Sequence, residues 1–353
     1  MHSLKILLYA VGLLSLCNCT RQNCSITALC EEDNNGNYIL KWELYPEQDN
    51  ASIEIYVSDN DSVFPSSPAM ITDANNYIAV LAKGDSLGYR YFRLKVGQSV
   101  SDVITNRFFE LNSVQNFRDA GGYRTTDNKM MRWGKIFRSG DFSGLTPEDE
   151  SRLNKLKLKT LIDFRPNKAI RKSPDRLNLT NEFHLPITAN AYDNVSKRII
   201  EGKFLRGDAV IYTQDFYRDM VENYTQAYAR MFDYMCDANN YPIVLHCYLG
   251  KDQSGIATYF ILRALSVPAE VAEEDYMLSN MGINKDKIMS GADSLSESRQ
   301  EALTMITKTD PAFLRYAMSG LRAKYGSIDN YMTTELKLTT DKRKKLQEIL
   351  LYR

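Results

Sequence analysis

The segment HCYLGKDQSG at residues 246–255 contains the side chains with the greatest capacity for chemistry. It lies between an apolar run at 243–245, typical of a buried parallel strand, and an apolar stretch at 256–267, typical of a buried helix. A loop that leads from such a strand into a helix directs its backbone N–H groups at one point, where the helix dipole favours an anion. The segment therefore predicts an anion-binding loop.

Cys247 begins this loop, so the same field favours its thiolate over its thiol. Nucleophilic attack on a phosphate ester requires such a thiolate, with donors around the three equatorial oxygens. Gly250 and Gly255 allow the loop to turn tightly, Lys251 adds a positive charge, and Asp252 can protonate the leaving oxygen. A lone cysteine is usually a small buried hydrophobe, but this combination at a strand-to-helix junction predicts a nucleophile.

The loop resembles the HCxxGKDRTG loop of the atypical bacterial tyrosine phosphatase family. NFRDAGGYRT at 116–125 is similar to the opening motif of that family, and KIFRSGDFSGLT followed by LKTLIDFRP is similar to its next two motifs. DYMLSN at 275–280 and YGSIDNYM at 325–332 extend the resemblance, which covers about residues 114–353. It implies a phosphoric monoester hydrolase without a cofactor. Members of the family act on phosphotyrosine and, in some cases, on phosphoserine or phosphoinositides.

The resemblance also implies that Cys247 forms the phospho-enzyme and that Asp252 is the general acid. Asp163 is a rival acid, because it closes an apolar run and should lie at the carboxyl edge of the same sheet, where such folds bind ligands. Alternatively, Asp163 forms a salt bridge to Arg165 or Lys168 that fixes its own loop. The sequence leaves both roles open.

The remaining candidate substrate contacts are the other residues of the loop and three arginines of the other motifs. They are Tyr248, Leu249, Gly250, Lys251, Gln253, Ser254 and Gly255 in the loop, and Arg118, Arg138 and Arg165 outside it. Any of these arginines can instead brace a carboxylate such as Asp119.

Gln253 departs from the family pattern, in which the sixth residue after the cysteine is an arginine that binds two phosphate oxygens. By analogy with the loss of one oxyanion donor, the penalty is ~3 to 4 kcal/mol, or roughly 10² to 10³ in rate. If Lys251 or one of the three arginines takes its place, a slow phosphatase results, which is the leading hypothesis. The alternatives are a pseudophosphatase that binds a phosphorylated ligand without turnover, and a vestigial site. Ser254 favours retained chemistry, because its hydroxyl can donate to the Cys247 thiolate.

The segment 113–353 alternates apolar strands with helical stretches, which predicts an α/β phosphatase domain with a parallel sheet flanked by helices. The region 189–240 has a helical pattern and is long for a connection between strands. It is either a lid over the site or a packed helical insertion.

The segment 20–112 has short alternating runs that predict a small all-β sandwich, similar to immunoglobulin or fibronectin modules. The predicted strands are 38–44, 51–57, 77–82 and 89–96. Trp42 should lie in the core of this module. No residue cluster there points to chemistry, and its partner cannot be read from the sequence.

The segment 1–19 predicts a signal peptide, because Lys5 precedes an apolar run that is too short to span a bilayer. Cys17 or Cys19 is a candidate for lipidation, which would make the protein a lipoprotein held at a membrane by that anchor. The alternative is an ordinary cleaved signal. Both predict export, to the periplasm or a membrane face, where Cys24 and Cys30 can form a disulfide.

The charge balance of the chain argues against partners that require a strong field. Lys plus Arg and Asp plus Glu number 44 each, so no overall field gathers nucleic acid or an anionic membrane. The chain has 3 histidines, and His184 and His246 are too few for a multi-histidine metal centre, so we expect no metal. Phosphotyrosine, phosphoinositide and soluble inositol phosphate remain possible substrates.

Overall fold

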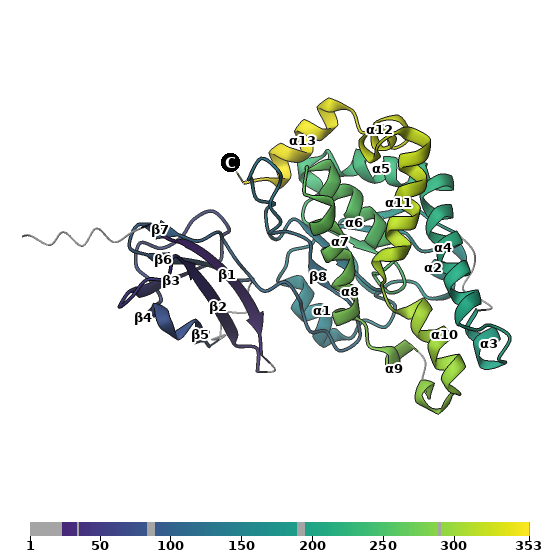
Figure 1. Ribbon diagram of the computed structural model, residues 1–353, viewed down its shortest axis with the longest axis horizontal. Coiled ribbons are helices and arrows are strands. Elements are labelled where there is room, and N and C mark those ends of the chain that lie inside the picture. Colours follow the sequence, from purple (N-terminus) through teal and green to yellow (C-terminus); the bar gives the residue numbers. More distant parts are fainter. Residues whose placement is uncertain (1–22, 34, 83–88, 189–194, 289–290, 353) are drawn as a thin grey trace, which may run out of the picture.

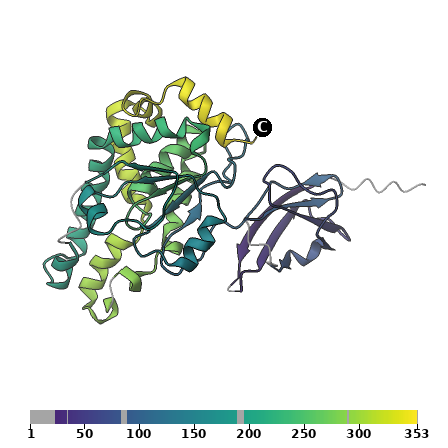
Figure 2. The ribbon, with the colours of Figure 1, turned by 180° about the vertical axis from the view of Figure 1, so that it is seen from behind.

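The protein comprises a small β-rich unit and a larger unit of helices around a sheet, which lie side by side (Figure 1, Figure 2). A computed structural model describes residues 23–33, 35–82, 89–188, 195–288 and 291–352. The predicted signal, with Cys17 and Cys19, lies outside the described residues. Near its carboxyl end, the chain bridges Met131 of the larger unit through Leu351, and Tyr352 packs against a cluster that includes Tyr91 and Val103 of the preceding segment.

The N-terminal unit contains two antiparallel sheets. The first has the order β1 (Ser25–Glu32), β2 (Tyr38–Tyr45) and β5 (Ile78–Leu81). The second has the order β4 (Met70–Asp73), β3 (Ser52–Ser58), β6 (Tyr91–Val96) and β7 (Ser99–Val100). Residues of β2, β3, β5 and β6 form one hydrophobic cluster that includes Trp42, whose Nε1 donates to the Ala74 carbonyl oxygen at 2.8 Å. The four predicted strands and the core position of Trp42 are confirmed, whereas β1 and β4 were not predicted.

The expected disulfide between Cys24 and Cys30 is wrong. Both cysteines are free, and they lie along one extended segment, with Cys30 inside β1 and Cys24 just before it. Six residues of extended chain span about 20 Å, far beyond the reach of a disulfide.

The larger unit is built on a sheet of 5 strands with the order β11 (Asn181–His184), β10 (Thr160–Asp163), β12 (Ile243–His246), β9 (Ile136–Ser139) and β8 (Arg118–Asp119). The first four are parallel to their neighbours, and β8 is antiparallel to β9. Every residue of β9, β10 and β12 is buried, as expected for parallel strands covered on both faces. The predicted sheet is confirmed, with one antiparallel edge strand added.

Helices surround this sheet, as the sequence pattern predicts (Figure 1). They are α1 (Pro147–Asn154), α2 (Asn167–Lys172), α3 (Val195–Ile200), α4 (Arg206–Asn223), α5 (Thr225–Met235), α6 (Gln253–Ala264), α7 (Ala269–Met277), α8 (Ser279–Gly282), α9 (Lys285–Ile288), α10 (Glu297–Thr307), α11 (Pro311–Tyr325), α12 (Ile328–Thr334) and α13 (Thr340–Leu350). Every residue of α6 except Arg263 is buried, so the helix after the cysteine loop lies in the core.

The helices α3, α4 and α5 occupy the described part of the region 189–240. Helix α4 packs against α10 and α11, and it buries Phe216, Tyr217 and Met220 in the core of the larger unit. Such burial favours the packed insertion over the lid for this part, while residues 189–194 lie outside the described residues.

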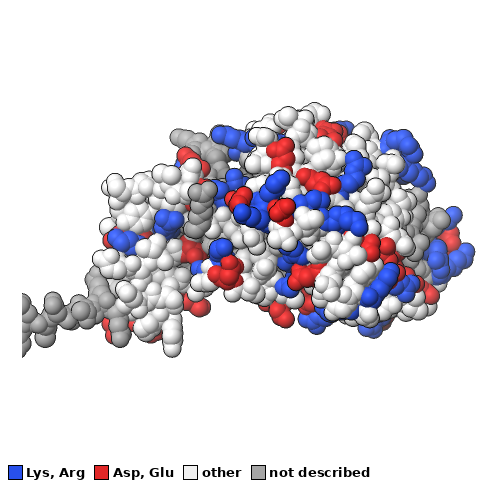
Figure 3. Space-filling view, turned by 90° about the horizontal axis from the view of Figure 1, so that it is seen from above, with Lys and Arg blue, Asp and Glu red and all other residues white. Residues whose placement is uncertain are grey.

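The two units are joined by polar and aromatic contacts. Arg132 binds the Asp61 carboxylate at 2.9 to 3.1 Å, and Trp133 Nε1 donates to the Val103 carbonyl oxygen at 2.8 Å. On the face seen in Figure 3, basic and acidic side chains are interspersed on the larger unit, in keeping with the balanced composition. Among the described helices, none is long and apolar enough to cross a bilayer.

Candidate active site

The loop 247–252, which connects β12 to α6, requires glycine at position 250, and a second glycine lies in the first turn of α6. Gly250 has a φ of +65°, and a Cβ there would lie 2.4 Å from the carbonyl carbon of Ser139. A Cβ at Gly255 would lie 2.9 Å from Nη2 of Arg138. Since no real Cβ approaches backbone this closely, the loop can pass β9 only because position 250 has no side chain.

Cys247 lies at the start of this loop and is 1% exposed. Its Sγ atom is 3.4 Å from the Oγ atom of Ser254, a fully buried residue in the first turn of α6. The contact expected between these two side chains is therefore present. Tyr248 is 41% exposed at the outer edge of the loop, and Leu249 is half-buried.

Arg138 supports the loop from β9. Its Nη2 atom donates to the carbonyl oxygens of Gly250 at 2.7 Å and Lys251 at 3.2 Å, while its Nη1 atom binds Asp275 at 2.7 Å. Because a trans peptide directs its N–H opposite to its C=O, the Lys251 N–H must point away from Arg138. The Arg138 guanidinium thus fixes the peptide between Gly250 and Lys251 so that its N–H group faces away from Arg138.

Arg118 reaches the same loop through an intermediate side chain. It binds Asn116, and Asn116 Nδ2 donates to the Leu249 carbonyl oxygen at 2.9 Å. The Nη2 atom of Arg118 also donates to the Asp275 carbonyl oxygen at 3.0 Å. Burial and the neighbouring charge of Arg138 lower the pKa of Arg118 to about 9, although Asp275 opposes the shift.

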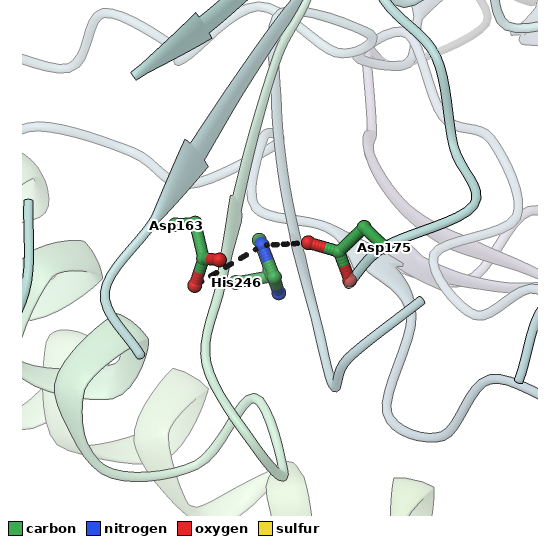
Figure 4. A group of neighbouring side chains, drawn as sticks. All are labelled: Asp163, Asp175 and His246. Carbon is green, nitrogen blue, oxygen red and sulfur yellow. Dashed lines mark ion pairs between the residues drawn. The ribbon is translucent and has the colours of Figure 1, made fainter. Parts of the chain in front are cut away.

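Four charged groups gather beside the loop, three of them buried and Asp175 nearly so, and three of the four are drawn in Figure 4. His246 Nε2 lies 3.3 Å from Asp163 Oδ1 and 3.1 Å from Asp175 Oδ2. Arg165 Nη2 donates to Asp163 Oδ2 at 2.8 Å and to Asp175 Oδ2 at 2.6 Å. Asp175 also accepts from the Phe142 N–H at 2.9 Å, so it joins the segments that follow β9, β10 and β12.

The charges in this cluster stabilise one another. Burial alone would lower the pKa of His246, but Asp163 and Asp175 outweigh it and raise the pKa to about 9. Burial alone would raise the pKa of Asp163, but His246 and Arg165 hold it well below its usual range. At neutral pH the cluster therefore holds two carboxylates, one imidazolium and one guanidinium, and its net charge is zero.

A metal ion does not fit this cluster. The ligand atoms of Asp163, Asp175 and His246 lie within 4.8 Å of one another, as a metal site would require. However, both carboxylates already bind Arg165, and His246 is protonated, whereas a metal ligand must be a neutral imidazole.

Asp252 binds groups on both sides of the loop. Its Oδ1 atom is 2.7 Å from Lys251 Nζ and accepts from the Tyr217 hydroxyl at 2.6 Å. Lys251 is 1% exposed, and Gln253 begins α6 with 4% exposure. Since Arg118, Arg138 and Arg165 are all held by carboxylates or backbone, the cation that belongs to the loop itself is Lys251.

Sequence reasoning missed Asp175, Tyr217 and Tyr276 at this site. Asp175 lies in an irregular segment with no periodic pattern, and only the preceding Pro174 marks a turn. The two tyrosines belong to α4 and α7, where a buried aromatic side chain looks like ordinary core. Their contact with Asp252 arises from helices distant in the sequence, and the motif DYMLSN, which contains Tyr276, gives no sign of it.

Comparison with known proteins points to one family. The model of a tyrosine phosphatase family matches residues 109–352. A Cupriavidus necator protein described as a tyrosine-protein phosphatase is 26% identical over 239 residues, 64% of this chain and 83% of that protein. The triple specificity protein phosphatase PtpB of Mycobacterium tuberculosis is 27% identical over 194 residues, 48% of this chain and 68% of that protein. The catalytic core of the PP-IP phosphatase SIW14 from S. cerevisiae aligns with a TM-score of 0.29 and 13% identity over 63% of this chain and 98% of that chain, which is too weak to carry an argument.

Proposed function

Because the chain belongs to the tyrosine phosphatase family and is a phosphoric monoester hydrolase of that type, we propose that it acts through a cysteinyl-phosphate intermediate at Cys247. The observation that supports this most strongly is the position of Cys247 between a buried parallel strand and the amino end of α6, with Ser254 Oγ 3.4 Å from its sulfur. Donors at a helix amino terminus favour both the thiolate and the phosphate.

The proposed reaction has two steps. The Cys247 thiolate attacks phosphorus, the bond to the leaving oxygen breaks, and that oxygen takes a proton from Asp252. A water molecule then attacks the phosphocysteine, Asp252 takes a proton from the water, and the sulfur regains its electron pair as phosphate leaves. The N–H groups of the loop and the charge of Lys251 surround the phosphate oxygens.

We assign the general acid to Asp252, because it lies within the cysteine loop itself, where its Oδ1 atom also contacts Lys251. The Asp163 carboxylate binds Arg165 and His246, and its pKa is held far below the usual range, so it seldom carries a proton to donate. We assign Asp163 to the bracing of its loop, together with Arg118, Arg138 and Arg165. Gln253 makes the enzyme slow, since a lost oxyanion donor costs ~3 to 4 kcal/mol.

The proposed substrate is a phosphate monoester, with phosphotyrosine, phosphoinositide and inositol phosphate as candidates. The relative named a triple specificity protein phosphatase supports a site that accepts more than one kind of ester. We further propose that residues 1–19 export the protein, that Cys17 or Cys19 anchors it as a lipoprotein at a membrane face, and that the segment 20–112 is a β-sandwich spacer before the catalytic unit 113–353.

The test is turnover of an aryl phosphate by the full chain, beside Cys247→Ser and Gln253→Arg. We expect slow wild-type turnover, none in Cys247→Ser, and a rise of about 10²-fold in Gln253→Arg. Wild-type turnover no higher than that of Cys247→Ser would refute the proposal. If orthovanadate nevertheless raised the melting temperature of that inactive wild type, the pseudophosphatase alternative would replace it.

A further inference from the structure

Two buried tyrosines from separate helices meet at the candidate general acid. Tyr217 of α4 and Tyr276 of α7 are both 0% exposed. Their hydroxyl oxygens are 2.7 Å apart, and the Tyr217 hydroxyl is 2.6 Å from Asp252 Oδ1. The two phenols therefore form a short chain that ends on the carboxyl group.

The direction of this chain follows from the number of protons. Each phenol has one proton to donate, and an ionised carboxylate can only accept. Tyr217 therefore donates to Asp252, and Tyr276 donates to Tyr217. Burial and the charge of Asp252 raise the pKa of both tyrosines above their usual range, so they remain phenols and keep these protons.

Two contacts converge on one oxygen of Asp252. Oδ1 accepts from the Tyr217 hydroxyl and lies 2.7 Å from Lys251 Nζ. Tyr217 enters from α4 and Lys251 from the loop, and together they restrict rotation of the carboxyl plane.

We propose that Tyr217 is a positioning residue that holds the Asp252 carboxyl group in place for its role as general acid, and that Tyr276 orients Tyr217. The inference rests on the proposed function, because it assigns a role within that reaction. It also assigns a role to the helical insertion, because α4 supplies the Tyr217 hydroxyl that contacts Asp252.

The test uses Tyr217→Phe in the full chain and a series of aryl phosphates whose leaving groups run from nitrophenol to phenol. Phenylalanine keeps the ring, which packs near Tyr276 and Phe313 with centroids 6.1 and 6.2 Å away. We expect kcat/KM, which reports the step in which the leaving group departs, to fall roughly tenfold for phenyl phosphate and to stay near wild type for nitrophenyl phosphate, because a poor leaving group depends on the acid most. Tyr276→Phe should show the same trend more weakly.

Tyr228→Phe is the matched control. Tyr228 is also fully buried near Asp252 and Cys247, but among the described residues its hydroxyl has no hydrogen-bond partner. Its removal should leave the dependence on leaving group unchanged. In the double variant Tyr217→Phe/Asp252→Asn, kcat/KM should equal that of Asp252→Asn, because no acid remains to be positioned.

Three results would overturn the inference. One is a Tyr217→Phe enzyme equal to wild type, and another is a loss of the same size for every leaving group, which a general loosening of the fold would produce. Both leave the proposed function intact, because wild type and Cys247→Ser still differ. The third is a wild type without turnover, which removes the proposed function and this role with it. Should Tyr217→Phe fail to fold, Tyr276→Phe carries the same test.

Discussion

Replacement of Asp175 by asparagine would leave the neutral cluster beside the loop with an uncompensated positive charge. In the native protein, Asp163 and Asp175 balance Arg165 and His246, and all four side chains are buried or nearly so. Removal of one partner from a buried pair costs about 3 to 5 kcal/mol. For a folding unit of this size, each kcal/mol lowers the melting temperature by roughly 2 to 4 °C, so we expect a decrease of about 6 to 20 °C.

Urea and thermal unfolding of Asp175→Asn measure this cost directly. The exposed pair of Lys197 and Glu201, 3.8 Å apart, offers a control, since Glu201→Gln should change stability by less than about 1 kcal/mol. Asp175→Asn/Arg165→Met restores neutrality, so it should be less destabilised than the sum of its single variants. A cost for Asp175→Asn no larger than that of Glu201→Gln, or strict additivity in the double variant, would refute the charge-balance reasoning.

Two further outcomes follow from the same buried charges. The free energy of unfolding should fall by roughly 3 kcal/mol as pH rises from about 6.5 to about 9. The folded pKa of His246 is raised to about 9, so its stabilising contribution is complete below the unfolded pKa and is lost as the folded imidazolium deprotonates. Urea titrations at several pH values should show a flatter profile for His246→Gln. Asp275→Asn should cost about 3 to 5 kcal/mol, because Arg138 and Arg118 lose a buried carboxylate at 2.7 and 3.8 Å, and a urea midpoint near that of wild type would contradict this expectation.

The general architecture and the cysteine loop could be predicted because both depend on local patterns. Continuous apolar runs identified the buried strands, and the strand-to-helix junction identified the loop around Cys247. The strand β1 was missed because the exposed apolar side chain of Leu29 interrupts its alternation, and its pairing with β2 cannot be read from local pattern. The disulfide was wrong because proximity in sequence, between Cys24 and Cys30, becomes separation once the chain is extended.

The roles of the arginines could not be read from the sequence for a different reason. Arg165 pairs with Asp163 two positions away, as one of the sequence alternatives had it. Arg118 and Arg138 also belong to recognisable motifs, but they bind Asp275, which lies far along the chain. Arg138, for example, binds Asp275 across 137 positions and Gly250 across 112. Tertiary packing alone decides whether such a guanidinium faces the ligand or supports the loop, and here it supports the loop.

The same placement determines how Gln253 should affect the kinetics. Arg118 and Arg138 share one carboxylate, Asp275, so a net positive charge remains behind the loop. Such a charge, which does not touch the transferring group, acts almost equally on the bound ester and on the transition state. Substrate binding should therefore be largely retained.

An arginine at position 253 would instead bind oxygens whose charge and position change during transfer, and only such differential contacts accelerate the chemical step. Gln253→Arg should consequently raise kcat far more than it lowers KM. A variant that lowered KM with kcat unchanged would show that the missing guanidinium serves binding alone.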